Sequence, residues 1–214
     1  MSAKRSSSGS RPLKRRVATR RPRKTLLVFC EGERTEPEYL TALKRQPVVK
    51  DVAAVDLRVD AGHGGSVPAT LVDLAVAARE RAVAEEDEID EIWCVFDVEW
   101  PRNHPGLKEA VDRARGNGIN LAISNPCFEL WLILHFQDLT RWSDNDDVRR
   151  LRSGLDGSKD KGLDALRYMP FVQEAAGRAA RLEDRHLRND TPFPDDNPSS
   201  GMHRLIASVE PPKP

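Results

Sequence analysis

The sequence of 214 residues has few cysteines and no long apolar run. Its three cysteines, Cys30, Cys94 and Cys127, are an odd number at wide spacing, each inside or beside an apolar run. We therefore expect buried, reduced thiols and neither a disulfide framework nor a zinc site. No apolar run approaches the length of a membrane span, and the first clearly apolar stretch begins only at Leu26. These absences predict a cytoplasmic protein without a secretory signal peptide.

Nucleotide-binding and strand-passage motifs are also missing. The glycine-rich stretch from Gly62 to Gly65 precedes an expected helix, but it matches neither a Walker A motif nor a dinucleotide fingerprint, and we interpret it as a turn. The two tyrosines, Tyr39 and Tyr168, lie in no recognisable nucleophile context. The sequence thus argues against an ATPase and against a topoisomerase.

Acidic residues are absent from the N-terminal segment. Residues 1–24 hold ten Lys or Arg and no Asp or Glu, so the rest of the chain has 24 basic side chains against 34 acidic ones, a net charge of about −10. The segment has almost no large apolar residue, which predicts a disordered tail. Few aromatic residues interleave with its arginines, so it supports nonspecific phosphate contacts at most. An acidic body repels nucleic acid unless metal ions, a basic patch or this tail compensate.

The remaining residues, 25–210, read as one α/β domain. The apolar run TLLVFC at 25–30 is typical of a strand buried on both faces. Thr35 and Glu38 form a T-x-x-E capping box with Pro37 in the first turn, which predicts a helix to about Arg45. A second strand is expected at 55–59. The next helix has apolar spacing at five positions: Leu71, Leu74, Ala75, Ala78 and Val83.

The second half of the domain continues this alternation. EIWCVF at 91–96 predicts a strand, followed by a helix over about 105–116 and a strand at 119–124. Asn125 and Pro126 suit the cap and first turn of a buried, apolar helix, FELWLILHF. Helices are also expected near 163–187 and 202–209. Strands alternating with helices predict a mainly parallel central sheet flanked by helices.

Acidic residues follow two of the predicted strands. Glu31 comes directly after the first, and Asp97 and Glu99 follow EIWCVF. Because the carboxyl ends of parallel strands meet at one edge of a sheet, three carboxylates are expected there. They repel one another unless a cation lies between them, and Mg²⁺ (or Mn²⁺) suits such ligands. The alternative is that these acids are ordinary polar residues at strand ends.

Other charged residues have two interpretations each. Glu129 begins an apolar helix, where a buried carboxylate needs a partner such as a metal-bound water or an arginine. Glu36 and Glu38 lie in the first turn of a helix, where the helix dipole favours acidic side chains. We assign Glu38 to a structural role and keep Glu36 as a candidate that would contact the metal ligands and not the metal itself. Lys159 and Lys161 are either solvated or contacts of a scissile phosphate.

Three segments resemble the signature blocks of the RloB-like family: LLVFCEGERTEPEYL, EIWCVFDVEW and LAISNPCFELWLILHF. The stretch NPSSGMHRLI at 197–206 is similar to the family's closing motif. The resemblance implies a TOPRIM-like, Rossmannoid domain and a role in bacterial phage defence and abortive infection. It matches Glu31 to the TOPRIM glutamate and Asp97 and Glu99 to the D-x-D pair, with Glu99 replacing the usual aspartate.

Together these observations predict a Mg²⁺-dependent nuclease acting on DNA or RNA, with Glu31, Asp97, Glu99, Glu129 and Lys159 as candidate catalytic residues. The resemblance implies a separate AAA or ABC-type ATPase as partner. The alternative is a TOPRIM-like module without turnover, which binds nucleic acid or a partner and regulates an ATPase.

Overall fold

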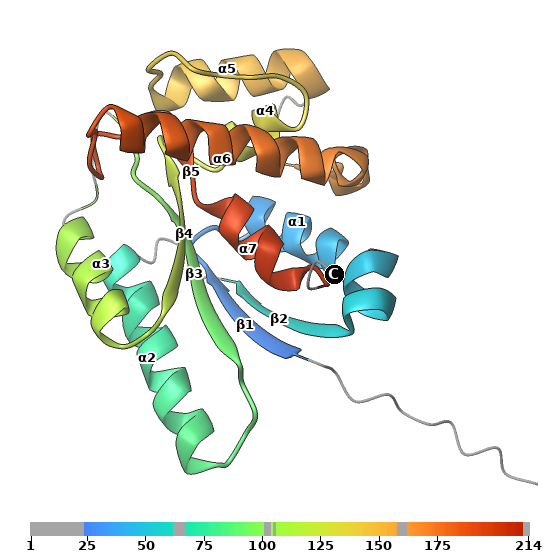
Figure 1. Cartoon of the computed structure of the whole chain (residues 1–214), viewed down its shortest axis with the longest axis vertical. Coiled ribbons are helices and arrows are strands. Elements are labelled where there is room, and N and C mark those ends of the chain that lie inside the picture. Colours follow the sequence, from blue (N-terminus) through green and yellow to red (C-terminus); the bar gives the residue numbers. More distant parts are fainter. Residues whose placement is uncertain (1–23, 62–66, 101–103, 105, 158–161, 212–214) are drawn as a thin grey trace, which may run out of the picture.

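Figure 1 shows the computed structural model of the chain, in which residues 24–61, 67–100, 104, 106–157 and 162–211 are described. The expected tail, apart from Lys24, lies outside these residues, and so do Gly62 to Gly65. Lys24 itself is the first residue of a strand, one position earlier than expected. Its ammonium forms an ion pair with Glu91 at 2.5 Å and donates to the Ser208 carbonyl at 3.1 Å.

Five strands form one sheet in the order β2-β1-β3-β4-β5. The first four are parallel and β5 is antiparallel to β4, which confirms the prediction of a mainly parallel sheet. The strands are β1 (Lys24–Cys30), β2 (Val55–Ala61), β3 (Glu91–Asp97), β4 (Asn120–Asn125) and β5 (Ser199–Ser200).

Helices cover both faces of this sheet. One face carries α2 (Pro68–Ala84) and α3 (Leu107–Gly116) (Figure 1). The other face carries four helices: α1 (Thr35–Lys44), α4 (Glu129–Leu134), α6 (Val172–Arg188) and α7 (Met202–Val209). A further helix, α5 (Asn145–Asp156), packs on α4. Short turns of π- and 3-10 helix complete the elements: η1 (Val48–Ala53), η2 (Ala165–Arg167) and η3 (Met169–Phe171). No helix in the described ranges is long and apolar enough to cross a membrane.

The apolar strands are buried on both faces because helices lie against each. In β1, Leu26 and Val28 belong to the core under α1 and α4, whereas Phe29 belongs to the core under α2 and α3. Successive side chains of a strand point to opposite faces, so a continuous apolar run supplies both cores. All three cysteines are buried and free, as expected.

The helix predictions need several corrections. The apolar residues of α4 are fully buried, as expected, but in α2 Leu74 and Val83 are 44% and 74% exposed. Val72 and Val76 are buried in their place, because the buried stripe is rotated from the one we predicted. The helix expected from Leu163 begins only at Val172, after two short 3-10 turns.

Both predicted helix caps are wrong. Thr35 is the first residue of α1, not its cap, and the Glu38 carboxylate accepts from the Leu163 N–H at 3.2 Å. Asn125 ends β4, and the residue preceding α4 is Phe128. The Asn125 side chain instead donates to the Pro194 carbonyl at 2.8 Å and to Asp196 at 2.9 Å. These partners lie far along the chain, where a local motif does not reach.

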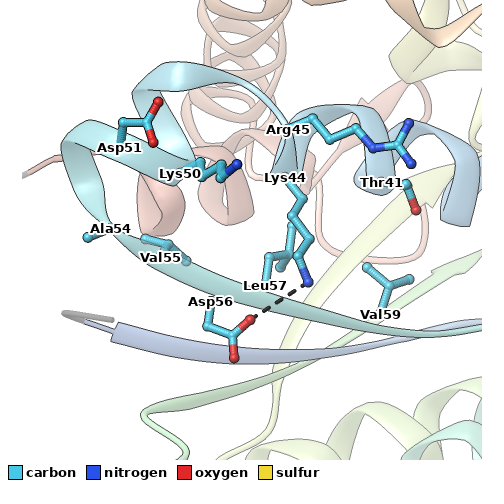
Figure 2. Close-up of a pocket in the computed structure, with 10 residues that line it drawn as sticks. All are labelled: Thr41, Lys44, Arg45, Lys50, Asp51, Ala54, Val55, Asp56, Leu57 and Val59. Atoms are coloured by element: carbon cyan, nitrogen blue, oxygen red, sulfur yellow. Dashed lines mark ion pairs between the residues drawn. The ribbon is translucent and has the colours of Figure 1, made fainter. Parts of the chain in front are cut away.

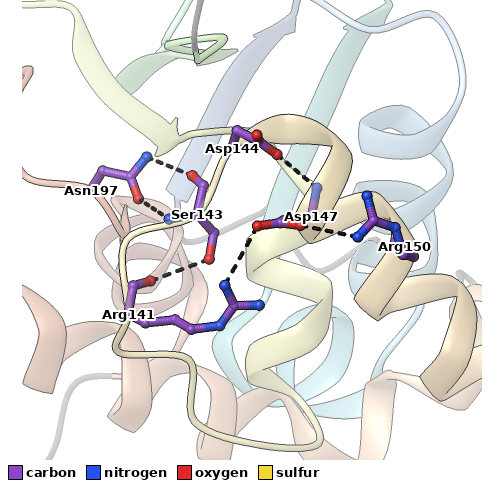
Figure 3. Close-up of polar contacts among 6 residues, drawn as sticks. All are labelled: Arg141, Ser143, Asp144, Asp147, Arg150 and Asn197. Carbon is purple, nitrogen blue, oxygen red and sulfur yellow. Dashed lines mark hydrogen bonds and ion pairs between the residues drawn. The ribbon is translucent and has the colours of Figure 1, made fainter.

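The segment leading into α5 is fastened to the C-terminal part of the chain (Figure 3). The Asn197 amide accepts from the Ser143 N–H at 3.1 Å and donates to the Ser143 carbonyl at 2.9 Å. Asp144 caps α5 by accepting from the Asp147 N–H at 2.8 Å. The side chain of Asn197 thus bonds both the N–H and the carbonyl of Ser143, as a neighbouring strand would.

Candidate functional site

The strand order reverses direction between β1 and β3. From β1 the chain passes through α1 to β2 on one side, whereas from β3 it passes through α3 to β4 on the other. The two connections diverge at the carboxyl ends of β1 and β3, which is where α/β proteins with such a switch in strand order bind ligands. Residues that follow these two strands are therefore the first candidates for a functional site.

A cavity of about 530 Å³ opens at this point. It brings together four of the five predicted site residues, Glu31, Asp97, Glu99 and Glu129, and the fifth, Lys159, lies outside the described residues. The complete lining is Glu31, Gly32, Glu33, Arg34, Thr35, Glu36, Asp97, Glu99, His104, Phe128, Glu129 and Arg149. Five of these side chains are carboxylates besides the exposed Glu33 at the rim.

Glu31 is held where β1 meets β3. Its N–H donates to the Val95 carbonyl at 3.0 Å, which extends the ladder, and its carboxylate accepts from the Asp97 N–H at 3.0 Å. Burial raises the pKa of Glu31 to about 7, and the charges of Glu99 and Glu36 add to the effect against the lowering by the Asp97 N–H. Part of the Glu31 population is therefore protonated near neutral pH in the metal-free protein.

Asp97 is the last residue of β3. Burial raises its pKa well above the ordinary value, and the negative charges of Glu36, Glu129 and Glu31 raise it further. Its Oδ1 atom is buried and has no hydrogen-bond partner among the described residues. A buried polar atom of this kind is costly, and functional sites are where such costs are found.

Glu99 has a backbone conformation that is rare for residues with a side chain. Its φ is +59°, and its N–H donates to the Pro126 carbonyl at 2.9 Å. Residues other than glycine are strained at positive φ, and such strain occurs often at functional sites. The turn brings Glu99 back to the cavity wall beyond β3, with the side chain 44% exposed.

Two residues of the site were missed from the sequence. His104 places Nε2 2.9 Å from Glu31 Oε1 and 3.5 Å from Glu99 Oε2. Its position in the same strand-to-helix connection as Glu99 was the signal that could have identified it. Arg149 reaches the cavity from α5, a helix that we did not predict.

Glu36 has a larger part in the site than its position in a helical first turn indicated. It is buried, and its negative charge raises the pKa of both Glu31 and Asp97. Its carboxylate lies directly over Gly32, where a Cβ atom would collide with it. Glycine at position 32 is thus what allows this fifth carboxylate to enter the cavity.

The donor set suits a hard divalent cation. Carboxylate oxygens are the ligands that Mg²⁺ and Mn²⁺ prefer, and the unpartnered Oδ1 of Asp97 is one such donor. Among the described residues no three acidic, histidine or cysteine side chains converge on one point at ligand distance. Binding an ion at these carboxylates therefore requires changes of side-chain rotamer, for which the exposed Glu99 has room.

A larger cavity, of about 740 Å³, lies between α1, η1 and β2 (Figure 2). Its charged side chains are of both signs: Lys44, Arg45 and Lys50 with Asp51 and Asp56. Lys44 and Asp56 form an ion pair at 3.7 Å across it. This cavity is larger than the acidic one, but its charges largely compensate each other.

The fold and the cavity define an α/β protein with a carboxylate-lined site at the switch point of a parallel sheet. A family model described as RloB-like protein matches residues 26–209, and the chain belongs to the RloB-like family. Searches of curated proteins and of solved structures gave no significant match.

Proposed function

We propose that this protein is a divalent-metal-dependent nuclease with a TOPRIM-like site, which hydrolyses phosphodiesters of DNA or RNA. The observation that carries the proposal is the meeting of Glu31, Asp97 and Glu99 in one cavity, with a buried Asp97 oxygen that has no partner among the described residues. Mutual repulsion and burial make this group unfavourable without a cation. A stable fold tolerates such a cost where function requires it.

Each side chain has a defined part in this proposal. Glu31, Asp97 and Glu99 would hold Mg²⁺ or Mn²⁺, which supplies an activated water and stabilises the leaving oxygen. The Asp97 N–H fixes the Glu31 carboxylate, and the Pro126 carbonyl fixes the backbone of Glu99. Arg149, like Arg34, supplies positive charge at the wall of a mainly acidic cavity, where a substrate phosphate has to approach.

We further propose that the protein acts in bacterial phage defence together with a separate ATPase of the AAA or ABC type. Family membership supports this role, and the chain has no Walker motif of its own. A module that keeps the site but does not cleave is the second candidate, and Glu99 in place of aspartate favours it. The longer arm of glutamate displaces the carboxylate by one methylene.

Substitution of the two strand-end acids tests the nuclease directly. Glu31→Gln and Asp97→Asn keep the size of the side chain and remove the charge, so we expect at least about a hundredfold loss of Mn²⁺-dependent cleavage of plasmid DNA or total RNA. If an ATPase gene adjoins this one, the assay includes its product. Glu99→Asp is expected to retain activity, and Glu99→Gln to reduce it while leaving some binding.

The control is Asp56→Asn in the larger cavity, which should cleave as the parent protein does. Calorimetric titration of Mn²⁺ accompanies each assay. If Glu31→Gln and Asp97→Asn bind Mn²⁺ as tightly as the parent, the three-carboxylate site is wrong. If Mn²⁺ binds to the parent but no substrate is cleaved with the partner present, the module without turnover is the better account.

A further inference from the structure

An exposed tryptophan stands beside the acidic cavity. The chain has four tryptophans, of which Trp93 and Trp131 are buried and Trp100 is partly buried. Trp142, in contrast, is 54% exposed. A single exposed apolar residue needs no explanation by itself, so its surroundings decide whether the exposure has a use.

Trp142 packs on Trp100, the residue that follows Glu99 of the cavity wall. The two rings pack edge to face, with centroids 6.4 Å apart and planes at 69°. Trp100 directly follows Glu99, and its carbonyl accepts from the Asn145 N–H at 3.2 Å. The segment from Trp142 to Asn145 is thus bonded to the residues that follow β3, among them Glu99.

The backbone next to Trp142 is held rigidly. Both main-chain groups of Ser143 are bonded to the Asn197 side chain, and Asp144 caps the following helix (Figure 3). An aromatic ring presented on a fixed backbone loses little conformational freedom when a ligand packs against it. This is a property of binding surfaces more than of accidental exposure.

The same segment carries three arginines among aspartates. Arg141 and Arg150 share one carboxylate, that of Asp147, at 3.5 Å and 3.2 Å, while Asp144 caps the helix (Figure 3). Arg149, on the same helix, lines the carboxylate cavity. Arginines beside an exposed ring are the combination that binds single-stranded nucleic acid, in which the backbone meets the cations and a base stacks on the ring.

We propose that Trp142 is a stacking surface for an unpaired nucleobase, with Arg141 and Arg149 contacting the adjacent phosphates. The inference rests on the proposed nuclease and narrows its substrate to single-stranded or locally unpaired nucleic acid, because a base within a duplex does not offer its face. The base on Trp142 would belong to a nucleotide close to the phosphate at the cavity.

The test measures binding separately from cleavage. The full chain with Glu31→Gln is titrated, without divalent metal, into a fluorescent oligothymidylate of about 12 nucleotides and into an abasic oligomer of equal length and charge. Trp142→Ala should weaken binding of the oligothymidylate about tenfold and change that of the abasic oligomer less than about twofold. Trp142→Phe should retain most of the affinity, since it keeps an aromatic face.

Leu187→Ala is the matched control, because Leu187 is 73% exposed and belongs to another surface, that of α6. Equal losses for both oligomers, or none, overturn the stacking role, and so does equal affinity for a duplex of the same length. These outcomes are distinct from failure of the nuclease. A parent protein that never cleaves but shows the Trp142 effect contradicts the nuclease and keeps the stacking surface, whereas cleavage without the Trp142 effect contradicts the stacking surface alone.

Discussion

The two cavities at the N-terminal and C-terminal ends of α1 differ in how their charges are balanced. The cavity at β2 is the larger, about 740 Å³, and its lysines and arginine face aspartates. The cavity at the ends of β1 and β3 is about 530 Å³ and gathers five carboxylates of one sign around His104 and two arginines. In this second cavity, burial and mutual repulsion raise the pKa of Glu31 and Asp97.

Volume therefore does not identify the functional site of this protein. A compensated cavity gains little from a charged ligand, because its side chains already have partners. An uncompensated cavity carries a free-energy cost that a cation removes. Substitutions in the two cavities should therefore differ in their effects on stability and on Mn²⁺ binding.

The first prediction concerns the stability of the metal-free protein against pH. The pKa of Glu31 rises from 4.5 to about 7 on folding, so the folded chain binds this proton more tightly than the unfolded chain. The contribution of Glu31 to stability should fall by roughly 3 kcal/mol as pH rises from 4.5 to about 7, at about 1.4 kcal/mol per pKa unit. The raised pKa of Asp97 adds a fall of its own. Urea unfolding in EDTA across this range measures the loss.

Glu31→Gln should remove the Glu31 contribution, leave that of Asp97, and make the metal-free protein more stable than the parent above pH 7, while Mn²⁺ should stabilise the parent alone. Parallel stability curves for the parent and the variant would show that the Glu31 carboxylate carries no such cost.

The second prediction concerns the floor of the acidic cavity. In Gly32→Ala the new Cβ collides with the Glu36 carboxylate, which has to move within a buried site. We expect a loss of about 1–2 kcal/mol in unfolding free energy and weaker Mn²⁺ binding. Gly154→Ala in α5 is the control: its Cβ would meet nothing within 4 Å, and alanine favours a helix by roughly 0.5–1 kcal/mol. Equal effects of both substitutions would contradict the prediction.

The third prediction concerns the compensated cavity. Asp56 pairs with Lys44 at 3.7 Å and with Arg58 at 3.0 Å, and these side chains are partly exposed. Asp56→Asn should therefore change the unfolding free energy by less than about 1 kcal/mol, with no effect on Mn²⁺ binding. A loss several times larger would mean that the ion pairs of Asp56 contribute to the unfolding free energy as buried ion pairs do.

The strands β1 and β3 were predictable because their apolar runs end abruptly, whereas the two serines of β5 gave no strand signal. Strands with both faces covered leave a clear signal, and the acids that end β1 and β3 meet because parallel strands place their carboxyl ends together. The helix α5 was missed although Val148, Leu151 and Leu155 stand at helical spacing and pack on the core. Three apolar residues among twelve form a narrow stripe, which is a weaker signal than a continuous apolar run.

Residues whose role depends on distant partners were the ones that sequence patterns placed wrongly. Asn125 matches a helix cap locally, but Pro194 and Asp196 bind its amide at the end of β4. Glu36 matches a helical first turn, and only the tertiary fold shows that it enters the cavity over Gly32. Local patterns thus identified which acids end strands, whereas the fold decided which other side chains join them.

The bond between Asn197 and Ser143 also bears on the order in which the protein is assembled during translation. All five carboxylates of the cavity are synthesised by residue 129, together with the four parallel strands. The residues that fasten Asn125 and Ser143 emerge from the ribosome only some 65 residues later. A nascent chain therefore contains every acidic group of the site well before the segment that carries Trp142 is anchored.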